Sequence, residues 1–176
     1  MKKFILLIIT ILSYLQSLAQ ININGGYIQS LDRISTNESS VSFPGRGFYA
    51  GAGFNIMSAS NPQISFCPGL NFALLNIKVN EEEFKETFFT APLHIKYTEN
   101  LTSDGPIVFI SVGPSLICPV EGEKIDITVG LEAGLLSINS HLRFIVGFDI
   151  GTINRASGTN SRYTRNILHL GVGYTF

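Results

Sequence analysis

The sequence is poor in charge, and beyond its first residues it lacks any apolar run long enough for a membrane-spanning helix. Charged residues make up 14% of the 176 residues, against about 25% in typical soluble domains. After residue 20 no apolar stretch approaches the roughly 18 residues that a spanning helix needs. A chain this apolar is unusual for a water-soluble protein. Since lipid offers no partner to an unpaired backbone N–H or C=O group, a closed β-barrel is the membrane structure that remains.

Net charge and cysteine are scarce as well. The net charge is −1, and no basic stretch with interleaved aromatic residues occurs, which excludes nucleic acid as a partner. The two cysteines, Cys67 and Cys118, fit no metal-binding spacing and no disulfide framework. The strand register described below places them on opposite faces, so we expect two free, buried thiols, with a single disulfide as the alternative. The sequence indicates no metal site and no cofactor.

The N-terminus has the three-part layout of a secretory signal peptide. A basic head, Met1-Lys2-Lys3, precedes an apolar stretch from Phe4 to Leu12 and a small-residue exit, Ser17-Leu18-Ala19. This apolar stretch is too short to span a membrane as a helix. We therefore expect export through the Sec pathway, cleavage after Ala19, and one mature domain over residues 20–176; an uncleaved anchor helix is the alternative.

The mature chain alternates between apolar and small or polar residues in eight segments, each about as long as a tilted membrane-crossing strand. In the second segment Phe48, Ala52 and Phe54 alternate with Tyr49 and Gly53. The polar faces carry mainly Gly, Ser, Thr and Asn, as in a narrow lumen, rather than the Lys and Glu of a water-washed face. We predict an all-β, eight-stranded antiparallel transmembrane β-barrel of up-and-down topology, whose apolar faces contact outer-membrane lipid. The predicted strands are residues 20–30, 47–57, 63–77, 87–97, 106–118, 125–136, 141–151 and 164–176.

The lengths of the connections agree with this topology. One end of the predicted barrel has the mostly longer links 31–46, 78–86, 119–124 and 152–163, and the other has 58–62, 98–105 and 137–140. Longer loops are typical of the extracellular end and shorter turns of the periplasmic end. Loops 31–46 and 152–163 are the candidate surfaces for a protein partner.

Three prolines fall inside predicted strands. Pro68, Pro92 and Pro114 each remove one hydrogen-bond donor from a closed sheet. The sequence therefore predicts local β-bulges at these positions.

Several short phrases resemble the small outer-membrane β-barrel proteins of Bacteroidetes-type bacteria, the porin-family or PorT-like proteins. The phrases are Ser17-Leu18-Ala19-Gln20, the stretch 89–97 (FTAPLHIKY), Gly113-Pro114, the stretch 129–134 (VGLEAG) and the closing stretch 171–176 (GVGYTF). The resemblance extends over the whole mature chain and implies the same barrel architecture. PorT-like members are linked to protein secretion, but no residue here selects that role.

Charged side chains recur on the predicted lumen face, with both signs represented. Buried ions must pair or stay hydrated, because an unpaired buried ion costs several kcal/mol. We interpret these residues as an internal salt-bridge network that plugs the barrel, with a gated or selective passage as the alternative. The residues are Lys96, Glu132, Arg143, Asp149, Arg165 and His169.

The C-terminus predicts recognition by the outer-membrane assembly machinery. Phe176 ends the chain, and apolar residues including Tyr174 precede it at every second position, a pattern that resembles the C-terminal signal read by that machinery.

Two other function classes stay open. An outer-membrane lipid-modifying enzyme would use His94, His141 or His169 with a serine such as Ser137 or Ser140 and a carboxylate. Three histidines and many serines make such a neighbourhood common by chance, so we expect no enzymatic activity. A secreted soluble ligand-binding barrel would instead turn its Leu and Phe faces inward. We favour an integral outer-membrane barrel with a structural, surface-interaction or narrow-passage role.

Overall fold

A computed structural model describes residues 19–36, 39–79, 82–102, 105–120, 125–137, 141–151 and 161–176. The signal-peptide prediction falls almost entirely on residues outside these ranges. No helix in the described ranges is long and apolar enough to cross a membrane. The strands are β1 (Ala19–Thr36), β2 (Ser40–Met57), β3 (Ile64–Val79), β4 (Glu82–Asn100), β5 (Ile107–Pro119), β6 (Asp126–Leu136), β7 (Leu142–Gly151) and β8 (Ser161–Thr175).

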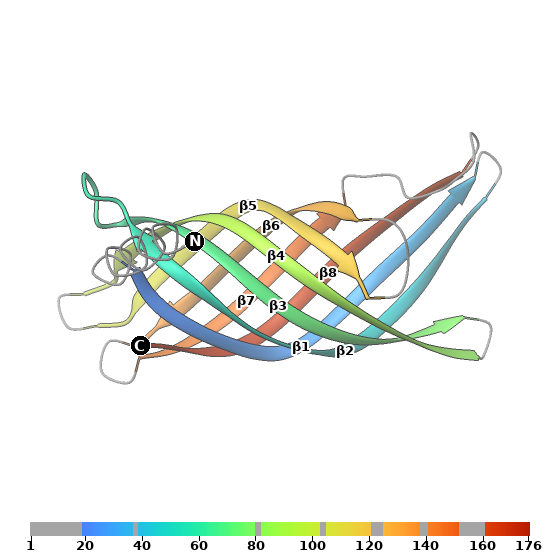
Figure 1. Cartoon of the computed structure of the whole chain (residues 1–176), viewed down its shortest axis with the longest axis horizontal. Helices are drawn as coiled ribbons and strands as arrows, with labels where there is room; N and C mark the ends of the chain where they lie inside the picture. Colours follow the sequence, from blue (N-terminus) through green and yellow to red (C-terminus); the bar gives the residue numbers. More distant parts are fainter. Residues whose placement is uncertain are drawn as a thin grey trace, which may run out of the picture.

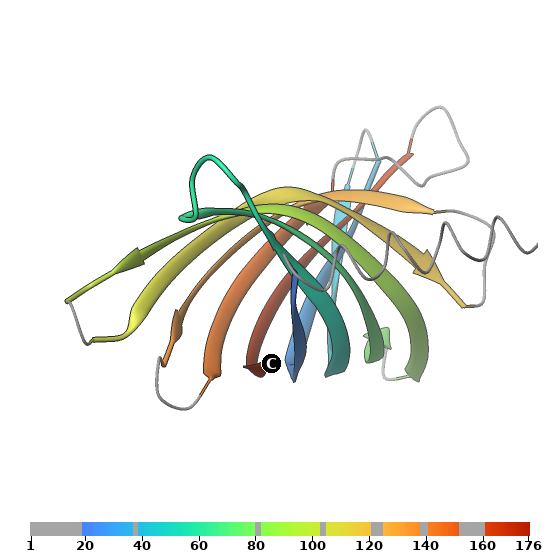
Figure 2. The same ribbon diagram turned by 60° about the vertical axis from the view of Figure 1, so that its left-hand side comes forward.

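These strands form a closed antiparallel barrel in sequence order (Figure 1). Each strand pairs with the next along the chain, and β1 pairs with β8 from Asn22 opposite Thr175 to Thr36 opposite Ser161. The predicted fold class is therefore confirmed. The strands lie side by side with a common tilt, which a second view also shows (Figure 2). The start of β1 and the C-terminus share one end of the barrel, which we call the terminal end; the opposite end is the hairpin end.

The side-chain alternation places apolar residues outside and polar residues inside. Phe48 is 71% exposed and the neighbouring Tyr49 is 9% exposed, and the same alternation recurs in the other strands. The predicted inward and outward faces are confirmed in all eight segments. Outward-facing Phe, Leu, Ile and Val side chains are exposed on every strand.

Two predicted loops are wrong, because their residues continue the strands. Residues 31–46 belong largely to the β1–β2 hairpin, which is paired as far as Ser35 opposite Ser40. Residues 78–86 belong largely to the β3–β4 hairpin, where Val79 lies opposite Glu82. Near these hairpins the outward-facing residues of the strands are mainly polar. The sequence of these strand ends therefore resembles that of loops. The predicted loop 152–163 lies mainly outside the described residues.

The barrel wall is therefore taller on one side. Strands β1 to β4 and β8 rise above β5 to β7 at the hairpin end. Segment 82–87 of β4 lies past the last β4–β5 pair, Phe88 opposite Pro119, and segment 161–165 of β8 lies past the last β7–β8 pair, Ile150 opposite Asn166. We call β1 to β4 with β8 the tall wall.

The predicted bulges at the prolines are wrong as well. Around Pro68, β2–β3 pairing stops after Gly53 opposite Gly69 and resumes at Ile56 opposite Phe66. Both strands advance by three residues across this gap, so neither strand has an extra residue. The β3–β4 and β4–β5 ladders are likewise interrupted beside Pro92 and Pro114 and resume with the same offset. A missing proline N–H thus removes pairing locally without inserting an extra residue.

Candidate functional site

The lumen holds the polar and charged side chains that are the candidate functional residues. Because side chains alternate along each strand, every second residue of all eight strands points into this narrow space. From the hairpin end to the terminal end, the lumen contains an ion cluster, an apolar layer, a histidine–carboxylate cluster and a pair of cations.

The ion cluster centres on Arg165 of β8, which is 1% exposed. Its Nε and Nη2 donate to the two carboxylate oxygens of Asp32 at 2.7 and 2.8 Å. Its Nη1 and Nη2 donate to Glu86 at 2.9 and 2.6 Å, and Nη2 also donates to the Tyr163 hydroxyl at 2.9 Å. One guanidinium therefore links β1, β4 and β8 through bidentate bonds to two carboxylates.

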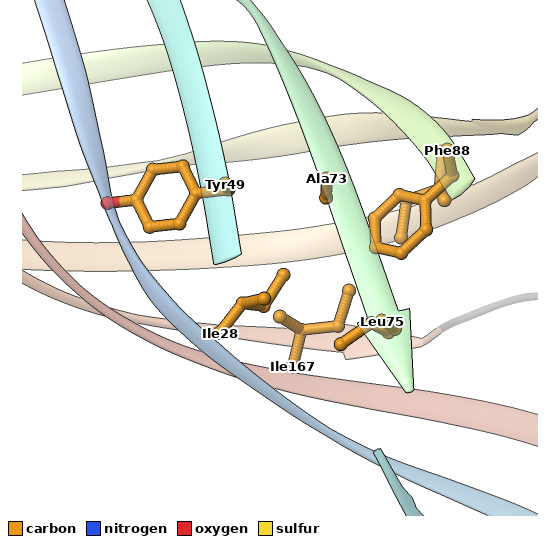
Figure 3. Close-up of a cluster of buried hydrophobic side chains, with 7 residues drawn as sticks. Ile28, Tyr49, Ala73, Leu75, Phe88 and Ile167 are labelled. Atoms are coloured by element: carbon orange, nitrogen blue, oxygen red, sulfur yellow. The ribbon is translucent and has the colours of Figure 1, made fainter. Parts of the chain in front are cut away.

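An apolar layer follows inside the barrel (Figure 3). Its members come from strands β1, β2, β3, β4, β5 and β8, and all are buried. The Phe88 ring faces the ion cluster, since the guanidinium carbon of Arg165 lies 5.5 Å from the ring centroid. The layer consists of Ile28, Tyr49, Ala73, Leu75, Phe88, Ile117 and Ile167. These side chains separate the ion cluster from the polar lumen beyond them.

The histidine–carboxylate cluster lies on the other side of the apolar layer. Glu132 on β6 contacts His169 Nε2 through Oε1 at 3.3 Å and His94 Nδ1 through Oε2 at 3.7 Å. His169 Nδ1 lies 3.6 Å from Asp149 Oδ2. Gly147 provides the room, because a Cβ there would stand 2.0 Å from His169 Nε2. Glu132 is thus held by two imidazoles from β4 and β8.

Serine hydroxyls complete this cluster. Ser115 Oγ lies 3.3 Å from His94 Nε2, and Ser111 Oγ donates to Glu132 Oε2 at 3.2 Å. Ser115, His94 and Glu132 thereby combine a hydroxyl, an imidazole and a carboxylate, the groups that nucleophilic catalysis uses. His94 is 3% exposed and Ser115 is 4% exposed, so a substrate would have to enter the lumen to reach them.

Two cations lie near the terminal end of the lumen. Lys96 on β4 and Arg143 on β7 are 8% and 7% exposed. Arg143 Nη2 donates to Asn22 Oδ1 at 3.0 Å, and Arg143 Nε is buried without a hydrogen-bond partner. The Lys96 ammonium lies 5.8 Å from the centroid of the Phe109 ring. In the described part of the chain, neither cation has a carboxylate oxygen within ion-pair distance.

Small cavities flank the histidine–carboxylate cluster. One, of about 40 Å³, lies between this cluster and the apolar layer, and one of about 50 Å³ lies between it and the two cations. A single water needs roughly 10–15 Å³ of such volume. Each cavity therefore has room for a few waters or a small ion, and neither has room for a lipid or a peptide.

The six charged residues named from the sequence all point into the lumen but occupy three separate places. Arg165 lies in the ion cluster, Glu132, Asp149 and His169 lie together, and Lys96 and Arg143 form the cation pair. The sequence reasoning missed the partners of Arg165, because Asp32 and Glu86 fall in stretches read as loops. The signal that could have found them is continued alternation, with Asp32 and Glu86 in step with the inward residues of their strands.

The remaining candidate residues lie elsewhere. His141 has a positive φ of 54° in the β6–β7 connection, and its ring contacts Tyr174, with the ring centroids 5.9 Å apart. Ser140 falls outside the described residues. Tyr174 and Phe176 are both exposed, with ring centroids 4.9 Å apart.

The cysteines are free and half-buried, and no described group of three or more His, Cys, Asp or Glu residues could hold a metal ion. Cys67 faces the lumen and donates to Asn55 Oδ1 at 3.1 Å. Cys118 lies opposite the outward-facing Phe89. The two thiols thus lie on opposite faces, as the register predicts, although neither is fully buried.

Comparison with known proteins identifies the fold. No family model matches the chain, and no curated protein matches it. Among solved structures it is similar to Neisserial surface protein A, with 14% identity, a TM-score of 0.51, and 90% of this chain and 99% of that chain covered. It is also similar to the outer membrane protein OprG from Pseudomonas aeruginosa, with 12% identity, a TM-score of 0.50, and 90% and 96% covered. The chain therefore has the fold of the small bacterial outer-membrane β-barrels.

Proposed function

We propose that the protein is an integral outer-membrane barrel with a closed lumen, and that it acts at the cell surface through its tall wall. The observation that carries this proposal is the inversion of polarity between the two faces of the sheet. Outward-facing Phe48, Phe144 and Val172 are each more than half exposed, whereas Arg165 and Asp32 are buried inside. A soluble barrel would turn these faces the other way, so the outer face fits lipid.

The residues on the outer surface of the tall wall change from apolar to polar, which supports a boundary between lipid and water at this height. On β3 the exposed outward residues change from Phe72 and Leu74 to Asn76 and Lys78. Lys78 lies opposite Glu83 on β4. Charged pairs on an outward face fit the aqueous side of the boundary, so the upper hairpins would stand outside the bilayer as a binding surface.

The side chains that fill the lumen support the proposal that the barrel is closed to solutes. A solute moving through it would have to separate the apolar layer and the bidentate bonds of Arg165 to Asp32 and Glu86. The cavities of about 40 and 50 Å³ beside the histidine–carboxylate cluster are too small for a lipid substrate. These features favour a surface role over a porin-like passage or a lipid-modifying enzyme.

The orientation can be tested by labelling single cysteines on intact cells. In a background with Cys67→Ser and Cys118→Ser, Lys78→Cys places a thiol on the exposed upper part of β3. Ala59→Cys, at an exposed position in the β2–β3 connection at the terminal end, is the matched control. We expect a membrane-impermeant maleimide to label the Lys78→Cys protein on intact cells and the Ala59→Cys protein only after lysis.

The opposite labelling pattern would show an inverted orientation. Release of the protein from carbonate-washed membranes would instead show a secreted soluble barrel and overturn the proposal. A large, steady single-channel conductance in planar lipid bilayers would contradict the closed lumen.

The route to the membrane is part of the same proposal. We expect Sec export, removal of residues 1–19, and recognition of Tyr174 and Phe176 by the assembly machinery. The similarity of the short sequence phrases to porin-family or PorT-like barrels supports this route. N-terminal sequencing of the membrane form should begin at Gln20, and retention of Met1 would contradict it.

A further inference from the structure

We propose that the lumen at the terminal end is a binding site for one small oxyanion, held between Lys96 and Arg143. This inference concerns the inside of the barrel and does not depend on the proposed role at the cell surface. The ligand chemistry is a phosphate or carboxylate group, either as a free ion or as the end of a larger molecule.

The first observation is that both cations are buried without a carboxylate in direct contact among the described residues. Lys96 is 8% exposed and Arg143 is 7% exposed, and across the described residues no carboxylate oxygen lies within 4.0 Å of either side chain. Arg143 Nε is buried and has no hydrogen-bond partner. Burial of two unpaired like charges is costly, and an anion between them would relieve that cost.

The second observation is that both cations line one cavity with polar neighbours. The cavity of about 50 Å³ is bordered by Lys96, Arg143, Asn22, Asn55 and Ser111. Asn22 Oδ1 accepts from Arg143 and Asn55 Oδ1 accepts from Cys67. Since both amide oxygens are engaged, the amide N–H groups remain as donors for an anion.

A carboxylate also borders the cavity, but other groups already hold it. Glu132 Oε1 contacts His169 at 3.3 Å, and Oε2 accepts from Ser111 at 3.2 Å and contacts His94 at 3.7 Å. Its oxygens therefore contact the imidazoles and Ser111 directly, although its charge still attracts Lys96 and Arg143 at longer range, and it forms the inner boundary of the proposed site.

The size and position of the cavity define the ligand and its entry. About 50 Å³ is several times the roughly 10–15 Å³ that one water needs, which suits a single phosphate, carbonate or carboxylate group. Arg143 is the second residue of β7, and Asn55 lies near the end of β2. The site is therefore close to the terminal end of the barrel, from which an anion would enter.

Phosphate binding by the purified full barrel in detergent tests the proposal. Equilibrium dialysis with radiolabelled inorganic phosphate measures the stoichiometry, and a large sulfonate keeps the ionic strength constant. We expect saturable binding of about one phosphate per chain, weakened at least tenfold in Lys96→Met and in Arg143→Met. Lys78→Met, which removes an exposed cation from the outward face of β3, is the matched control and should bind as the wild type does.

Three outcomes with the methionine variants and their control would overturn the proposal. They are the absence of saturable binding, which means that water alone hydrates the cations, equal binding by all variants, and equal weakening by Lys78→Met. If Lys96→Met or Arg143→Met does not fold, Lys96→Arg and Arg143→Lys keep the charge and should still bind phosphate; folded variants that do not would also overturn it.

Competition separates the sources of the anion. Glycerol phosphate that competes as well as inorganic phosphate would assign the site to the terminal group of a larger molecule. Competition by phosphate alone would assign it to the free ion, and stronger competition by acetate would assign it to a carboxylate.

Discussion

Arg165 and Arg143 both point into the lumen, near opposite ends of the barrel, and their surroundings differ sharply. Arg165 donates to two carboxylates and a tyrosine hydroxyl, whereas Arg143 donates to the amide oxygen of Asn22 and leaves Nε unpaired. Burial alone therefore does not say what a lumen arginine does. A paired arginine stabilises the barrel, and an unpaired one is available to a ligand.

The largest effect should come from removing the paired arginine. Arg165→Met leaves Asp32, with a side chain 3% exposed, as a buried carboxylate without its counter-ion. Breaking a buried pair in this way costs about 3–5 kcal/mol. Urea midpoints of the barrel refolded into lipid should show this loss. Arg165→Lys keeps the charge without the bidentate geometry and should lose less; a wild-type midpoint for Arg165→Met would remove the contrast between the two arginines.

An arginine introduced on the outer face extends the comparison to a position whose neighbours across the strands are apolar. Leu131 on β6 is outward-facing and lies opposite Val112 and Phe148. If the outer face contacts lipid as proposed, Leu131→Arg should cost about 2–4 kcal/mol. The same refolding assay on Glu132→Gln, one residue along and facing inward, should give a folded barrel and a smaller loss. A larger loss for Glu132→Gln would mean that the outer face does not contact lipid.

The two carboxylates of the ion cluster should differ from each other. The Asp32 side chain is 3% exposed and the Glu86 side chain is 24% exposed, so water can replace part of the Glu86 interaction. Asp32→Asn should cost about 1–3 kcal/mol and Glu86→Gln less than about 1 kcal/mol. Equal denaturant midpoints for the two variants would show that exposure does not control their contributions.

The smallest effect should come from the unpaired arginine. Arg143→Met removes one hydrogen bond to Asn22 but also removes a buried charge without a counter-ion. These contributions oppose each other, so the free energy of unfolding in buffer free of phosphate should change by less than about 1 kcal/mol. A loss as large as that of Arg165→Met would show that Arg143 has a structural partner.

The sequence predicts the strand faces well, because a period of two needs only local residue order. It predicts the strand ends poorly, because Lys78, Glu83 and Lys85 lie on an outward face above the apolar residues, and a polar outward face resembles a loop. This error hid Asp32 and Glu86 and with them the ion cluster. Which lumen side chains contact each other depends on how the barrel closes. Residue order alone does not show this.

The sequence analysis did not predict the apolar layer, although the sequence contains a signal for it. Adjacent apolar residues occur where both faces of a strand are apolar, as in Leu74-Leu75, Phe88-Phe89 and Ile167-Leu168. In each pair one residue faces outward and the other is buried in the lumen. Reading only the outward face of each strand ignores the inner member of the pair.

The tall wall has a geometric consequence for contacts at the side of the barrel. A barrel of even height presents the same profile in every lateral direction. Here β1 has 18 residues and β7 has 10, so at the hairpin end the molecule has a high side and a low side. Among the residues that the structure describes, the strands β5 to β7 form a low rim, whereas β2 and β3 form a standing sheet. In the membrane setting that we propose, the barrel would have a front and a back, and lateral encounters would depend on how it is rotated about the barrel axis.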